Sequence, residues 1–184
     1  MKPVILASVL ALSMPLSTAQ EDPVEAPTET ETPINLLNIG QPERVVEIIQ
    51  DAGYRAKLNR IEDGQKFIES SANGMKFQIR FYGCTEQQTD CELLVFTTGF
   101  DFADPQDERL VARWNYERFT KAYLDEEGDP FIQLPVNILH GVTVANFEDT
   151  LIWFTTEMAA FMDHIGWNET PDDSAGSRIQ ATPT

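Results

Sequence analysis

The sequence predicts an α+β fold in which helices pack on a mainly antiparallel sheet. Three observations lead to this class. Apolar and polar residues alternate through 75–82, an Asn-Gly pair at 73–74 separates two strand-like segments, and an apolar stripe with helical spacing occupies 147–165. A two-residue period indicates a strand with one buried face, whereas a period of three to four residues indicates an amphipathic helix.

The first predicted element is a helix from Pro42 to Ala52. Proline is favoured in the first turn of a helix, and Gly53 suits the C-terminal cap because it tolerates a positive φ. Four apolar residues within this range indicate one buried face: Val45, Val46, Ile48 and Ile49.

Four strands should follow as an antiparallel meander. Their predicted ranges are Tyr54–Ile61, Lys66–Ser71, Met75–Tyr82 and Leu93–Thr98. Residues 62–64 form one turn, and Asn73-Gly74 forms the next, since Asn-Gly between strands is the strongest short hairpin signal. The meander is therefore expected to bury one face of its sheet.

The second half of the chain returns to helices. A helix is predicted over Asp107–Thr120, with Leu110, Val111 and Trp114 facing inward. Two short strands, Lys121–Leu124 and Phe131–Leu134, should then be joined by an acidic turn. The last helix begins at Thr143 or Asn146, either of which can cap it, and should lie across the sheet. Its apolar residues recur at three- and four-residue intervals: Phe147, Leu151, Phe154, Met158, Met162 and Ile165.

Both ends of the chain differ in composition from the middle. Residues 1–19 read as a secretory signal, with Lys2 at its start, an apolar run of about 10 residues, and small residues before Gln20. That run is shorter than the ~20 residues of a membrane span, so we expect cleavage rather than a stable anchor. Residues 20–35 form an acidic leader, 36–167 the folded domain, and 168–184 a flexible tail. The expected location is periplasmic or secreted.

The two cysteines fit an oxidising compartment. Cys84 and Cys91 are the only cysteines, and an even number in an exported chain favours a disulfide. Closing so small a loop stabilises the fold by about 2.5 kcal/mol on the chain-entropy model. The spacing differs from the two-residue gap of redox and zinc motifs, so a structural bridge is predicted rather than a thiol catalyst.

The net charge of the chain indicates which classes of partner it can bind. The formal net charge is -17, and removal of residues 1–19, which contain Lys2 and no acid, leaves -18. A surface of this sign repels phosphate backbones and anionic lipids, which disfavours nucleic-acid binding and favours cationic partners or divalent ions.

No arrangement of residues indicates catalysis, a cofactor or a metal centre. His140 and His164, the only histidines, stand in different predicted elements without a partner at metal-ligand spacing. His164 is expected to interact with the negative end of its own helix. Asp125, Glu127 and Asp129 resemble a calcium loop, but the required downstream Glu is absent, which favours a plain hairpin turn. The chain is therefore predicted not to be an enzyme.

Four motifs stand out along the chain: Gly83-Cys84 with Cys91, Arg113-Trp114-Asn115-x-x-Arg118-Phe119, Asp125-x-x-Gly128-Asp129, and Gly141-Val142-Thr143-x-x-Asn146-Phe147. Together they resemble the motifs of the YbjN family of bacterial proteins, and the resemblance covers Pro42–Trp167. The resemblance implies a fold similar to type III secretion chaperones and a role in regulating sensory transduction. Chaperones of that shape dimerise and hold extended segments of client proteins, so it also implies a protein partner and, as an option, a homodimer.

Five residues of these motifs carry structural or binding hypotheses. Trp114 is predicted to lie in the core, because it falls in step with Leu110. Asn115 is expected to hydrogen-bond the backbone of the sheet, with a binding role as the alternative. Arg118 either pairs with an acid of the following hairpin or faces water. Asp125 and Asp129 belong to the acidic turn described above.

Two aromatic residues of the last helix suggest a partner surface. Trp153 and Phe161 lie off the apolar stripe, and exposed aromatic residues often mark contact surfaces. A helix buried on two sides is the alternative. The leading functional hypothesis is an exported binding or chaperone-like module that engages protein segments. The second is a periplasmic sensory accessory protein that responds to a small ligand or an ion.

Overall fold

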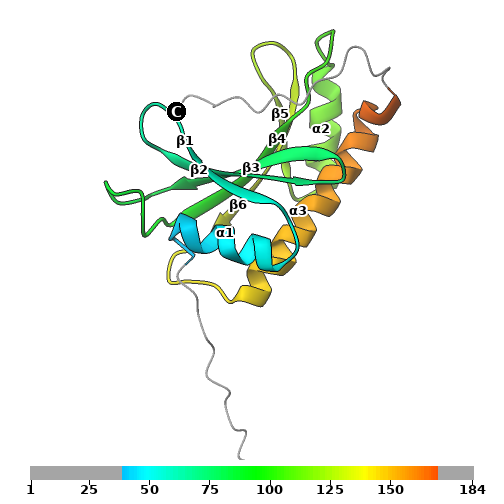
Figure 1. Ribbon diagram of the computed structural model, residues 1–184. Coiled ribbons are helices and arrows are strands. Elements are labelled where there is room, and N and C mark those ends of the chain that lie inside the picture. Colours follow the sequence, from blue (N-terminus) through cyan, green and yellow to red (C-terminus); the bar gives the residue numbers. More distant parts are fainter. Residues whose placement is uncertain (1–38, 170–184) are drawn as a thin grey trace, which may run out of the picture. The chain divides into compact units, whose positions relative to one another are not determined.

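The computed structural model describes residues 39–169, and these residues form an α+β fold as predicted. The predicted signal, the acidic leader and all but the first residues of the tail lie outside the described range. Three helices and a six-stranded antiparallel sheet make up the fold (Figure 1). The helices are α1 (Pro42–Asp51), α2 (Glu108–Glu117) and α3 (Val144–His164), and a short 3-10 helix, η1 (Trp167–Glu169), follows.

The sheet has the strand order β1-β2-β3-β4-β6-β5. Its strands are β1 (Ala56–Arg60), β2 (Lys66–Ala72), β3 (Met75–Tyr82), β4 (Leu93–Gly99), β5 (Lys121–Leu124) and β6 (Pro130–Asn137). The first four form the predicted meander. Asn73 and Gly74 have φ values of 54° and 79°, which is the left-handed backbone of a two-residue hairpin turn. This turn fixes the pairing of Ala72 with Met75 and hence the register of β2 and β3.

One face of the sheet forms the core with α3. Phe77, Ile79 and Phe96 are fully buried on this face, which we call the core face. The ring of Phe154 lies 5.5 Å from that of Phe77 and 5.3 Å from that of Phe96. Thr143 caps α3 by accepting a hydrogen bond from the Asn146 backbone, so the first of the two candidate caps is used.

Helix α1 packs on the same face near β1 and β2. Val45, Ile48 and Ile49 are buried, as their spacing predicts. Lys66 of β2 is also buried on this face, and its ammonium donates to Glu43 of α1 at 2.7 Å. A buried charge requires such a partner, so the ion pair fixes α1 over β2.

Strand β1 is shorter than its predicted range of 54–61, and two further boundaries differ from the prediction for physical reasons. Helix α2 ends at Glu117 rather than Thr120, because Arg118 takes an extended backbone (φ -130°, ψ 161°). Strand β6 is longer than predicted and continues through Pro135, which pairs with Val95 of β4. The pairing with β5 stops at Gln133, so β6 is an edge strand at Pro135, and proline is tolerated there. Among the described residues, no helix is long and apolar enough to cross a membrane.

Candidate functional site

The residues of the Trp-Asn and Arg-Phe motifs gather where α2 meets α3 and β5. Trp114 is 2% exposed, and its indole Nε1 donates to Thr120 Oγ1 at 2.9 Å. Its ring makes an edge contact with Phe161 of α3 at 4.9 Å between centroids. The prediction that Trp114 belongs to the core is therefore confirmed.

Asn115 hydrogen-bonds the backbone of the sheet, as predicted. Its Nδ2 donates to the carbonyl of Ala122 at 2.9 Å, and its Oδ1 accepts from the Ala122 amide at 2.7 Å. Because β5 is the last strand of the sheet, the amide group takes the place that a further strand would occupy. The side chain thus closes part of an exposed edge.

Arg118 pairs with an acid, but not the predicted one. Its guanidinium donates to Glu157 Oε1 of α3 at 3.1 Å, and Thr120 Oγ1 donates to Glu157 Oε2 at 3.2 Å. The guanidinium also lies over the Trp114 ring, 5.1 Å from its centroid. The prediction of a hairpin partner is wrong, because the extended backbone at Arg118 turns the side chain towards α3. Glu157 is 7% exposed whereas the Arg118 side chain is 45% exposed, so the pair joins a buried carboxylate on α3 to a half-exposed guanidinium after α2.

Histidine 164 also links α2 and α3. His164 Nε2 lies 2.9 Å from the carbonyl oxygen of Leu110, and its ring lies 5.3 Å from that of Trp114. The expected interaction with the end of its own helix is replaced by a bond to the neighbouring helix. The His164 side chain points into the interface between α2 and α3, so it bonds to α2.

The acidic turn between β5 and β6 is a hairpin turn, as predicted. Asp125 Oδ1 accepts from the amides of Glu127 and Asp129, at 3.0 and 2.9 Å. Asp129 is 3% exposed, and its Oδ1 accepts from the Phe102 amide at 2.9 Å. Burial raises the pKa of Asp129, and the nearby Asp125 and Asp101 add to that effect. One carboxylate oxygen of Asp125 and one of Asp129 thus hold the turn and the loop after β4. Within residues 39–169, no group of three or more candidate ligands could hold a metal ion.

Gly128 shows how closely the turn meets that loop. Its φ is 85°, and a Cβ at this position would lie 2.5 Å from the Cβ of Pro105. Only glycine therefore fits both the backbone and the approach.

The two aromatic residues proposed as a partner surface separate in the structure. Trp153 is 44% exposed and lies one turn before Glu157 on α3, in agreement with the prediction. Phe161 is fully buried, with its ring 5.7 Å from Phe100 and in contact with Trp114. The prediction for Phe161 is wrong, because α3 packs against the sheet on one side and against α2 on the other. The alternative, a helix buried on two sides, holds over this part of α3.

Two exposed aromatic residues were missed by the sequence interpretation. Tyr116 is 92% exposed and Phe119 is 91% exposed, and both lie at the C-terminal end of α2. Phe119 directly follows Arg118, which the ion pair holds against α3. The sequence could have indicated the exposure of Tyr116, because Tyr116 falls on the helix face opposite the core residue Trp114. We call Tyr116, Phe119 and Trp153 the junction aromatics.

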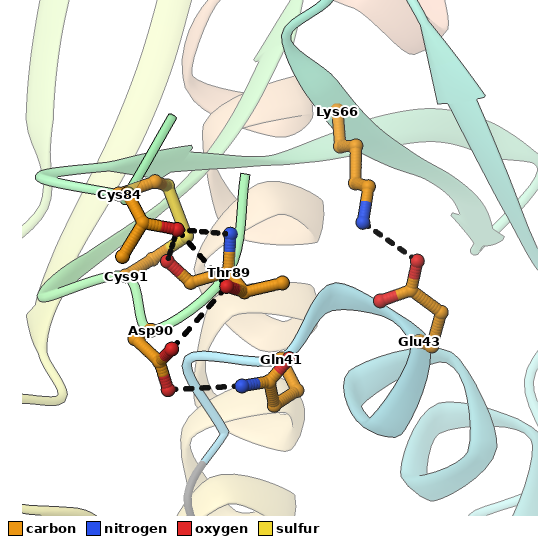
Figure 2. The surroundings of a disulfide bond; sticks show 8 residues. Gln41, Glu43, Lys66, Cys84, Thr89, Asp90 and Cys91 are labelled. Carbon is orange, nitrogen blue, oxygen red and sulfur yellow. Dashed lines mark hydrogen bonds and ion pairs between the residues drawn. A yellow bond between two sulfur atoms is a disulfide. The ribbon is translucent and has the colours of Figure 1, made fainter. Parts of the chain in front are cut away.

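Figure 2 shows the disulfide between Cys84 and Cys91, in the connection from β3 to β4. The Cys91 amide donates to the carbonyl of Gly40 at 3.1 Å, and Gln41 Nε2 donates to Asp90 Oδ1 at 2.9 Å. The crosslinked loop therefore holds the entry to α1 as well as closing on itself. A pocket of about 250 Å³ lies beside it, lined by Gln65, Phe81, Tyr82, Gly83, Cys84 and Gln88.

Comparison with known proteins identifies the family. Residues 41–179 match the model of the YbjN family, described as "Putative bacterial sensory transduction regulator". This match covers most of the chain, so the chain belongs to the YbjN family. A search of curated proteins finds no match.

Proposed function

We propose that this chain regulates by binding segments of other polypeptides, and that it does so through the junction aromatics. The observation that carries the proposal is the exposure of Phe119 and Trp153 on the two segments that the Arg118–Glu157 ion pair joins, with Tyr116 also exposed near the end of α2. Tyr116 and Phe119 are almost fully exposed, and Trp153 is nearly half exposed. Aromatic residues are enriched among the side chains that contribute most to protein interfaces.

The junction gives these aromatic residues a rigid base. Trp153 lies one helical turn from Glu157, and Phe119 is the neighbour of Arg118, so the ion pair connects their two segments. Beneath it, Trp114 is anchored by Thr120 and Phe161. A preorganised surface binds with a smaller loss of conformational entropy than a mobile one. This arrangement supports a binding surface rather than an accidental exposure of apolar groups.

The proposal contains no catalytic step. Asp125 and Asp129 hold a turn through hydrogen bonds, and Glu157 holds α2 to α3. A protein partner is proposed, with a second copy of the chain as one form it could take.

We also propose that the protein acts in the periplasm or after secretion. The signal-like residues 1–19 and the Cys84–Cys91 bridge support this location. Mass spectrometry of the protein from cell envelopes should find a chain that starts at Gln20 and has both cysteines oxidised. Free thiols on that material would contradict the proposed location.

The binding proposal is tested by removing two junction aromatics together. In Phe119→Ser/Trp153→Ser, thermal stability should change little, because exposed substitutions usually cost within ~0.5 kcal/mol each. Envelope cross-linking of the wild type should capture a polypeptide that the double variant captures several-fold less. Light scattering should show whether that polypeptide is a second copy.

Ile152→Ser is the matched control, because Ile152 is 55% exposed on the same helix. The control should keep the wild-type cross-links. Equal capture by the wild type and the double variant would refute the aromatic surface. If small molecules raise the melting temperature and no polypeptide is captured, the ligand-responsive alternative is the better function.

A further inference from the structure

The tip of the hairpin between β2 and β3 is docked on α3. Asn73 Nδ2 donates to the carbonyl oxygen of Thr155 at 3.0 Å, across a sequence separation of 82 residues. Met75, which follows the turn, is 6% exposed and belongs to the hydrophobic core, and Thr155 is also 6% exposed. One side-chain amide and one core residue therefore hold this tip on the helix.

The bond to Thr155 requires an amide at position 73. An aspartate has the same shape, but its carboxylate only accepts hydrogen bonds, so it would direct a negative oxygen at the carbonyl oxygen of Thr155. The backbone does not make this distinction. The φ of Asn73 is 54°, and asparagine and aspartate both tolerate this left-handed conformation. Conversion of Asn73 to aspartate would thus keep the turn and break the docking contact.

The residue after Asn73 favours such a conversion. The backbone nitrogen that follows an asparagine can attack the carbonyl carbon of its side chain, and a glycine there leaves the approach unhindered because it has no Cβ. Asn73 is the only asparagine of the chain that precedes a glycine. Within residues 39–169 the Gly74 amide donates no hydrogen bond, and a Cβ at Gly74 would meet no atom within 4 Å. The nitrogen that would attack is therefore neither engaged nor covered by this part of the chain.

We propose that Asn73 is a deamidation site, and that its conversion releases the β2–β3 hairpin from α3. The Gly74 nitrogen forms a bond to Asn73 Cγ and loses its proton, and the side-chain nitrogen takes up a proton and leaves as ammonia. Water then adds to either carbonyl carbon of the resulting succinimide ring and opens it. The product is aspartate or isoaspartate, and no atom is oxidised or reduced.

Both products undo the docking, by different routes. Aspartate loses the donor for Thr155. Isoaspartate carries the main chain through the former side chain, which adds a methylene to the main chain between Ala72 and Met75 and disrupts the two-residue turn that pairs them. In the folded chain the bond to Thr155 holds the amide on α3, so the reaction proceeds when the tip opens. This inference is independent of the junction aromatics.

The first experiment measures where and how fast deamidation occurs. The full chain is incubated at neutral pH, the more negative species is separated by ion exchange, and mass spectrometry of its peptides locates the change. Asn73 should convert many-fold faster than Asn59 or Asn115 in the same sample, and several-fold faster again in urea. Asn73→Gly keeps a residue that tolerates the positive φ but has no reactive amide, so it should not form this species. Conversion that is no faster at Asn73 than at the other asparagines, or no faster in urea, would overturn the proposal.

The second experiment measures the release of the hairpin by hydrogen exchange. In the separated species of the wild type, amides of residues 71–76 should exchange several-fold faster than in fresh protein, whereas those of α2 should not change. Asn73→Asp supplies the aspartate product alone and should show the same local increase. Asn59→Asp is the matched control, because it adds the same charge to the same sheet and the Asn59 amide donates to Lys57 of its own strand. Unchanged exchange at the tip of the separated species, or an equal increase in both variants, would refute release.

Discussion

The two faces of one sheet differ although they share every strand. On the core face, Phe77 and Phe96 meet the rings of α3, and the helices of the described chain cover them completely. On the opposite face, which we call the polar face, the same two strands place Gln78 and Thr97, which pair with each other and alternate with the core residues. The alternation of apolar and polar residues thus assigns one face of the sheet to the core, and Gln78 and Thr97 mark the other face.

Neighbouring residues of β4 provide the sharpest test of this comparison, with the largest effect. Phe96→Ala should destabilise the fold by about 3 to 5 kcal/mol, because it leaves a cavity among packed rings. Val95→Ala, on the polar face, should cost about 1 to 2 kcal/mol for two lost methyl groups. Urea denaturation of both variants measures the two values. Equal losses would mean that both faces are packed in the same way.

A substitution at the β5 edge of the sheet should cost less stability than Phe96→Ala. Asn115→Ala removes two hydrogen bonds to Ala122 of β5 and should cost about 1 to 2 kcal/mol. Arg109→Ala on the same helix is the control, since an exposed substitution stays within ~0.5 kcal/mol. If the two variants are equally stable by thermal denaturation, the amide does not hold the edge.

The ion pair between the buried Lys66 and Glu43 should make the stability of the fold depend on pH. The Lys66 ammonium lowers the pKa of Glu43 below its usual value of 4.5. A lowered pKa in the folded state stabilises the fold above 4.5, and this contribution is lost as the pH falls through the folded pKa. The melting temperature of the wild type should therefore exceed that of Glu43→Gln at pH 6, and the difference should shrink towards pH 3.

Glu47→Gln is the matched control for this ion pair, because Glu47 is 59% exposed and pairs with Arg44 only three residues away. It should show little difference from the wild type at either pH. A constant difference between the wild type and Glu43→Gln across this range would contradict an ionic contribution.

The smallest effects concern two hydroxyl groups, one on each face. Ser70 Oγ on the core face and Thr97 Oγ1 on the polar face are buried without a partner among the described residues. Ser70→Ala should change stability by less than ~1 kcal/mol, or raise it, because no hydrogen bond is lost. Thr97→Val should likewise change stability by less than ~1 kcal/mol, or raise it, because its hydroxyl has no partner within residues 39–169. A clear loss of stability in either variant by calorimetry would contradict this expectation.

Most strand positions could be predicted because period-two alternation and turn residues act locally. Met75–Tyr82 and Lys121–Leu124 match the structure at both ends, and Asn73-Gly74 turns as expected. The core role of Trp114 also followed from helical spacing. In each case, a residue's neighbours in sequence determine its environment.

What could not be predicted depends on contacts between distant segments. Phe161 looked exposed because one apolar stripe accounted for α3, yet α2 packs against its other side. Arg118 was matched to nearby acids, but its partner Glu157 is 39 residues away. Phe119 was overlooked because the end of α2 was placed three residues too late, so that Phe119 was counted inside the helix. The end of a helix and the side chains that pack against its second face depend on tertiary contacts. The spacing of residues in the sequence does not predict these contacts.

We propose the helix junction, not the sheet, as the surface that this chain offers to other polypeptides. A photo-crosslinker in place of Phe119 tests this surface in the full chain inside cells, with the same group in place of Leu139, which is 48% exposed on a loop, as the control. We expect a discrete adduct with a second polypeptide from position 119 and none from position 139. Matching adduct patterns from both positions, or no adduct from position 119, would contradict the proposed surface.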